Sequence, residues 1–173
     1  MRKVFSISAL MVLLGCGASV DGSSGGGASG PPCTLTVSGE ASGSYSCTTR
    51  FAVWSGTTDI GTVMMRYGTT GETTLVIGAT FTFAGVPRAG TFTEAEADAG
   101  VGARVTVTAG SRSWRATDGA ETTGRYTLFI SRVSSTKSLP DREIYAFSGS
   151  LDATLPPVPQ TSATEDITLH AAF

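Results

Sequence analysis

The sequence predicts an all-β protein whose main domain is an antiparallel β-sandwich of about eight or nine strands. From Cys33 onward, Val, Ile, Thr, Phe and Tyr alternate with small or polar residues, and glycine-rich breaks recur about every 8–12 residues. No stretch shows the apolar period of about 3.6 residues that an amphipathic helix requires. The same pattern fits a small up-and-down β-barrel, which stays open as the alternative.

The expected strands follow this alternation to the C-terminus. They cover residues 33–38, 44–54, 58–67, 73–83, 102–109, 112–117, 124–133, 143–154 and 165–173. Because successive side chains of a strand point to opposite faces, one face of each strand is expected to be buried and the other wet. The expected inward set is Tyr45, Cys47, Phe51, Val53, Leu75, Ile77, Ala79, Phe81, Phe83, Val105, Val107, Tyr145, Phe147, Leu151, Ala153, Leu155, Ile167, Leu169, Ala171 and Phe173.

The N-terminal residues predict export. Two basic residues precede an apolar run over 4–14. This run is shorter than the roughly 20 residues of a membrane-spanning helix but has the size of a secretory signal. It ends in Leu13-Leu14-Gly15-Cys16, which resembles a bacterial lipobox. The resemblance implies cleavage before Cys16, a lipid on its sulfur and acylation of the new amino group, and therefore attachment to a membrane.

A glycine- and serine-rich segment, GASVDGSSGGGASGPP, follows the anchor. It cannot bury apolar surface, so we expect a flexible tether with a reach of roughly 20–24 Å. The chain then divides into a signal peptide (1–15), a tether (16–32) and a single β-domain (33–173). Gly17 stands where Asp marks inner-membrane retention in some Gram-negative families, and by that sorting rule the outer membrane of a Gram-negative bacterium is the expected location.

The three cysteines divide into one anchor and one expected disulfide. A lipid-modified Cys16 cannot pair, which leaves Cys33 and Cys47 as an even pair in an exported domain. If these two face each other across a hairpin, Leu35 faces Tyr45 and both cysteines lie on the inward side. A redox or metal-binding pair is the less favoured interpretation, because no other thiol is near in sequence.

Three motifs are weak candidates for chemistry. His170 is the only histidine and is expected on a wet face, without an orienting partner or nucleophile visible in the sequence. The segment SSTK at 134–137 satisfies Ser-x-x-Lys, but the companion motifs of penicillin-recognising enzymes are missing and we expect a loop there. Glu94, Glu96 and Asp98 are weak Ca²⁺ candidates, with a solvated acidic loop as the default. No catalytic residue and no cofactor are expected.

Two tryptophans, Trp54 and Trp114, are weak candidates for contact with a protein or glycan ligand. Strand aromatics usually pack in the core or pair across strands. By alternation, however, Trp54 should point away from the side that carries Phe51 and Val53, which places it on the outward face.

The composition and the chain ends suggest an envelope protein. The formal charge is −2 and no basic stripe is visible, so nucleic acid is not an expected partner. The closing segments FSGSLDATLP and ITLHAAF resemble the ends of uncharacterised secreted bacterial β-domains, which implies an architecture and no activity. We expect a cell-envelope lipoprotein with a non-catalytic binding, interaction or structural domain. The alternatives are a lipocalin-like carrier of a small apolar ligand and a hydrolase of envelope polymers.

Overall fold

The structure is a computed structural model that describes residues 33–68, 75–94, 101–117 and 123–173. The signal peptide, the tether, Cys16, Glu96 and Asp98 lie outside these ranges. Within them the chain forms ten β-strands and no α-helix. In the same ranges, no helix is long and apolar enough to cross a membrane.

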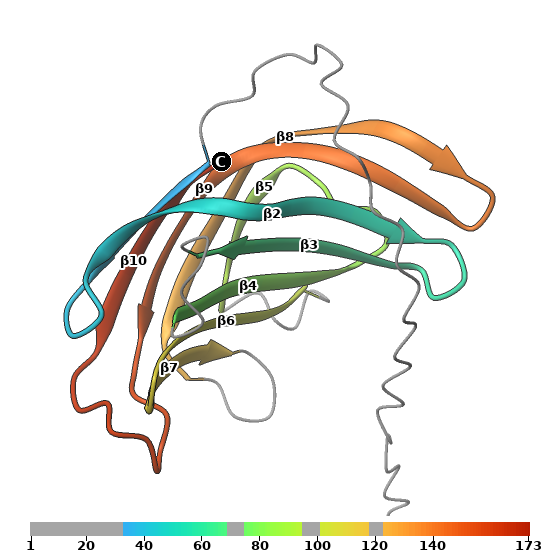
Figure 1. The fold of residues 1–173 in the computed structure, drawn as a ribbon. Helices are drawn as coiled ribbons and strands as arrows, with labels where there is room; N and C mark the ends of the chain where they lie inside the picture. Colours follow the sequence, from blue (N-terminus) through green and yellow to red (C-terminus); the bar gives the residue numbers. More distant parts are fainter. Residues whose placement is uncertain (1–32, 69–74, 95–100, 118–122) are drawn as a thin grey trace, which may run out of the picture.

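The ten strands belong to one antiparallel sheet (Figure 1). Their order in the sheet is β5-β8-β9-β10-β1-β2-β3-β4-β6-β7. The bounds are β1 (Thr34–Ser38), β2 (Gly43–Ser55), β3 (Ile60–Tyr67), β4 (Leu75–Ala84), β5 (Gly90–Thr93), β6 (Val101–Ala109), β7 (Arg112–Thr117), β8 (Arg125–Leu139), β9 (Arg142–Leu155) and β10 (Ile167–Ala172).

The sheet closes on itself at one point. The last part of β9, residues 150–155, pairs with β10, and the first residues of β9 pair with the end of β2. β1, β2, β9 and β10 therefore form a closed ring, and the other strands extend from it and curve over one another. In Figure 1, β2, β3, β4, β6 and β7 form the near layer, and β5 and β8 curve behind it. The prediction of an all-β sandwich or barrel is confirmed.

Large apolar side chains fill the space between the layers. Trp114, Phe81, Phe83 and Phe173 are among the fully buried residues. Three aromatic pairs meet edge to face, with ring centroids 5.0–5.5 Å apart, a geometry that favours the interaction. The inward faces expected for β4, β9 and β10 are confirmed, apart from half-buried Leu75.

A β-bulge in β2 overturns the expected face of its second half. Cys47 pairs with Tyr67, and Thr49 pairs with Arg66, the neighbour of Tyr67 in β3. Thr48 is therefore an extra residue in β2. An extra residue reverses which side chains point inward. Ala52 is consequently fully buried, and the prediction that Phe51 and Val53 point inward is wrong.

Two other segments differ from expectation. β5 was not predicted at all, although it pairs with β8 over Gly90–Thr93. The expected loop at Ser134–Lys137 is wrong, because β8 continues through it to Leu139 and stays paired with β9. Two register shifts, at 130–132 and 135–137, let this polar part of β8 follow the curvature of β9.

Candidate functional site

The most distinctive surface lies on the outer side of β3, β4 and β6. We call it the arginine face. Its side chains alternate with core residues of the same three strands and therefore point away from the core. It consists of Met64, Arg66, Val76, Gly78, Thr80, Arg104, Thr106 and Thr108.

Strand register fixes how these residues are arranged. Arg66 lies opposite Gly78, and Gly78 lies opposite Thr106 on the next strand. Arg104 lies opposite Thr80, two residues further along β4. With neighbouring strands about 4.8 Å apart and a rise of about 3.4 Å per residue, the Cα atoms of Arg66 and Arg104 are roughly 12 Å apart, on either side of β4.

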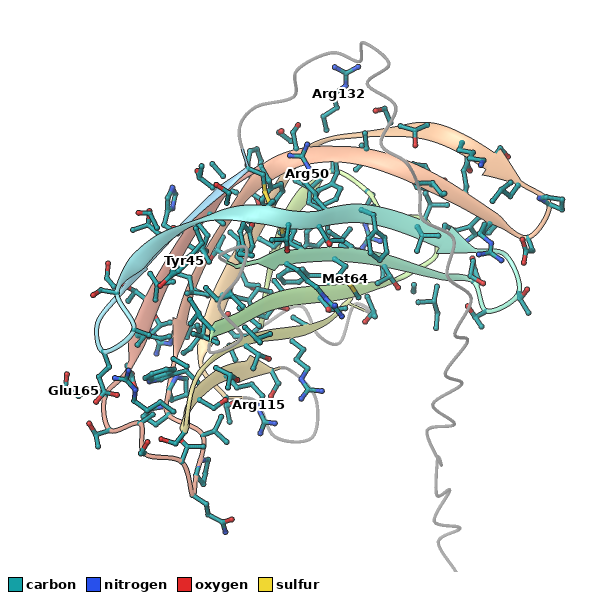
Figure 2. The ribbon with its side chains drawn as sticks, in the orientation of Figure 1. Tyr45, Arg50, Met64, Arg115, Arg132 and Glu165 are labelled. Carbon is teal, nitrogen blue, oxygen red and sulfur yellow. A yellow bond between two sulfur atoms is a disulfide. The ribbon has the colours of Figure 1, made fainter. Side chains whose placement is uncertain are left out.

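Gly78 leaves a hollow in the middle of the face. A side chain at this position would meet no atom within 4 Å, so the space above the glycine is open. The hollow measures about 320 Å³. Val76 at its edge is 61% exposed, and Met64 is half-buried. Figure 2 shows Met64 on the near side of the molecule, over β3 and β4.

The charge on this face is positive in the part of the chain that is described. Both Arg66 and Arg104 are exposed. The ion pairs found among the described residues are Arg142–Asp141 and His170–Asp152, and neither involves the arginine face. The two guanidinium groups are thus not neutralised by a described carboxylate, and the face attracts anions.

A second polar cluster lies on the outer side of β9 and β10. The His170 Nδ1 and Asp152 Oδ1 atoms are 2.6 Å apart, because the two residues are directly opposite in the register of these strands. On either side of this pair, Thr127 of β8 lies opposite Asp152, and Thr36 of β1 lies opposite His170. No motif in the sequence indicates this partner for His170, because Asp152 and His170 are 18 residues apart and only strand pairing brings them together. Both side chains are about 60% exposed, so solvent screens their interaction.

The predicted disulfide is present. Cys33 and Cys47 are bonded, with their Cα atoms 5.3 Å apart, and the backbone N–H of Cys47 donates to the Cys33 carbonyl at 3.0 Å. Leu35 pairs with Tyr45, which is the register expected from the cysteine positions. Tyr67 lies beside the disulfide, and burial raises the pKa of its hydroxyl group to about 12.

Neither tryptophan forms an exposed platform. Trp114 is fully buried, and its indole N–H donates to the Glu165 carbonyl at 2.8 Å. Trp54 packs against the core and donates to Asp59 Oδ1 at 3.0 Å, so the prediction that it points outward is wrong. The reason is the bulge in β2, which places Trp54 on the same side as buried Ala52.

The acidic candidates are only partly described. The Glu94 carboxylate accepts a hydrogen bond from the Tyr126 backbone N–H at 3.2 Å, while Glu96 and Asp98 lie outside the described residues. Among the side chains that are described, no three His, Cys, Asp or Glu residues come together to hold a metal ion.

The arginine face could not be found by sequence motifs. Arg66 and Arg104 come from strands separated by β4 and β5, and only the sheet order brings them to one surface. No family model, no curated protein and no solved structure matches the chain. The function proposed below therefore rests on the residues of this chain alone.

Proposed function

We propose that the chain is an exported cell-envelope protein, attached to a membrane by a lipid on Cys16, whose β-domain is a non-catalytic binding module. The observation that supports the lipid anchor is the pairing of the cysteines. Cys33 and Cys47 are bonded to each other, so Cys16 is the one cysteine outside the disulfide. It ends a lipobox-like stretch, and disulfides persist in the oxidising compartments outside the cytosol.

Two features support binding at the surface over the alternative functions. Phe81, Phe83 and Phe147 are buried between the layers, which fills the space that a lipocalin-like carrier needs for its ligand. The Asp152–His170 pair is the arrangement closest to a hydrolase site, yet it lies in solvent instead of a desolvated cleft that would tune its chemistry. The arginine face, by contrast, combines charge, hydroxyl groups and exposed apolar surface around one hollow.

The anchor is tested by labelling growing cells with radioactive palmitate. The wild type should be labelled and Cys16→Ser should not. The matched control is Cys33→Ser/Cys47→Ser, which should keep its label when read on a denaturing gel and normalised to protein amount. Equal labelling of wild type and Cys16→Ser would refute lipid attachment at this residue.

Location is tested separately by membrane fractionation. The labelled protein should sediment with the outer-membrane fraction, because Gly17 lacks the retention signal. Recovery with the inner membrane would contradict the outer-membrane assignment and leave the lipid anchor intact.

A further inference from the structure

We infer that the arginine face binds the phosphate headgroups of anionic lipids in the membrane to which the chain is anchored. This inference rests on the proposed function, because the anchor and tether are what keep the domain beside the bilayer. The domain would then lie on the membrane through β3, β4 and β6, and the opposite side would face away.

The charged groups of the face suit a phosphate. Guanidinium groups bind phosphate oxygens through two parallel hydrogen bonds. Arg66 and Arg104 flank the Gly78 hollow, with no carboxylate of the described residues within ion-pair distance. Thr80 and Thr106 add hydroxyl donors to the same hollow.

The apolar part of the face distinguishes a lipid from a soluble polyanion. Val76 is 61% exposed and Met64 borders the same hollow. Apolar side chains beside basic residues are typical of surfaces that rest at the boundary between headgroups and acyl chains. A soluble polyanion would satisfy the arginines but leave this apolar surface in water.

We expect the arginine face to bind an anionic membrane weakly. This affinity is too low to hold a free domain on the bilayer but is sufficient to hold a tethered one. Each basic residue near an anionic membrane strengthens binding about fivefold, so the two arginines together contribute roughly 25-fold. The tether expected from the composition of residues 17–32, with a reach of roughly 20–24 Å, would keep the domain at an effective concentration in the millimolar range. Weak contacts are then enough to hold the face on the bilayer.

A different part of the surface offers a matched control. Arg132 is exposed on the outer side of β8. Figure 2 shows it above the β8–β9 ribbon, away from Met64. Neutralising Arg132 changes the net charge of the protein as much as neutralising one arginine of the face does, without changing the face.

The experiment measures vesicle binding by the mature chain, residues 16–173, carrying Cys16→Ser, which lacks both the signal peptide and the lipid. Vesicles contain phosphatidylglycerol with phosphatidylethanolamine, or phosphatidylcholine alone. We expect Arg66→Gln/Arg104→Gln to weaken binding to the anionic vesicles about 25-fold, and Arg132→Gln to leave it unchanged. Concentrated salt should remove the difference between the variants.

Three results would overturn the inference. The first is equal binding of Arg66→Gln/Arg104→Gln and Arg132→Gln to anionic vesicles, with both variants showing wild-type thermal unfolding. The second is an equal effect of the arginine substitutions on phosphatidylcholine vesicles. The third is arginine-dependent binding of heparin with no arginine-dependent vesicle binding, which would assign the face to a polymer. Palmitate labelling of Cys16 is a separate measurement, so failure of the anchor and failure of the lipid-binding face can be told apart.

Discussion

The Cys33–Cys47 disulfide joins the start of the domain to β2 directly before its bulge. It closes a loop of about 15 residues, for which the chain-entropy model gives a stabilisation of about 3 kcal/mol. We predict that Cys33→Ser/Cys47→Ser lowers the free energy of unfolding by about that amount in urea denaturation. A reducing agent should destabilise the wild type similarly and leave the double variant unchanged. Equal sensitivity of both proteins to the reductant would contradict the prediction.

Glu40 links the β1–β2 turn to the segment before β10. Its carboxylate accepts hydrogen bonds from the Thr164 hydroxyl at 2.6 Å and the Thr164 backbone N–H at 3.0 Å. The bonds from Thr164 are the main cause that lowers the pKa of Glu40 below its ordinary value of 4.5.

The lowered pKa of Glu40 predicts an acid-dependent contribution to stability. Because the folded state binds the proton less tightly, this contribution is present above pH 4.5 and is lost as the pH falls through the folded-state pKa. Glu40→Gln should therefore be less stable than wild type at neutral pH, and the gap should narrow in acid. Thermal midpoints measured across this range check it. Parallel pH profiles for the two proteins would argue against the hydrogen-bonded carboxylate.

At the scale of single strands, the bulge in β2 allows both halves of the strand to bury the correct side chains. Before it, the cysteine pair lies on the inner side, and after it Ala52 and Trp54 do. Deleting Thr48 removes the extra residue, so no register keeps both halves inward. We predict loss of cooperative unfolding for the deletion, whereas Thr48→Ala should change stability by about 1 kcal/mol or less. Cooperative unfolding of the deletion variant would show that the bulge is dispensable.

Sequence alternation predicted the strands whose pattern is uninterrupted, and it failed where pairing with a neighbour decides the structure. The inward faces of β9 and β10 follow directly from their period of two. The bulge does not, because Cys47, Phe51 and Val53 have the same parity and suggest an unbroken strand. Only the pairing with β3 shows that one residue is extra.

The strand segments that sequence alternation does not predict are explained by similar physical causes. β5 contains four residues, too few to show a clear alternation, and its backbone is paired with β8. The end of β8 is polar and mostly exposed, so it carries no apolar pattern, and its backbone is held by pairing with β9. The arginine face is equally invisible in the sequence, since only the order of strands in the sheet brings its two charged residues to one surface.

Two glycines in strands should respond oppositely to substitution. Gly149 lies opposite Ile130 at the first register shift of β8, and a methyl group there would overlap the Phe129 backbone, which cannot move aside cheaply. We predict that Gly149→Ala destabilises the domain by about 1–3 kcal/mol. Gly78→Ala meets open space and should be neutral or stabilising by about 0.5–1 kcal/mol. Equal effects in chemical denaturation would show that the close approach at Gly149 does not matter.

For the whole molecule, the closed ring joins the two ends of the domain. β1 and β10 are neighbours, although they are the first and last of the ten strands in the described residues. The backbone N–H and carbonyl of Phe173 also bond to Gly149, and its ring packs on Phe147. The ring therefore cannot close until residues 167–173 are in place beside β1 and β9.

Removal of residues 167–173 should consequently prevent folding of the whole domain. The deletion takes away four buried side chains of β10 and its end, and it leaves the paired edges of β1 and β9 open to water. We predict rapid proteolysis and no cooperative thermal transition for this variant. The control is deletion of residues 17–32, which should leave the transition of the β-domain unchanged because the ring does not include them. A cooperative transition at the wild-type midpoint after loss of β10 would mean that β1 to β9 fold without closing the ring.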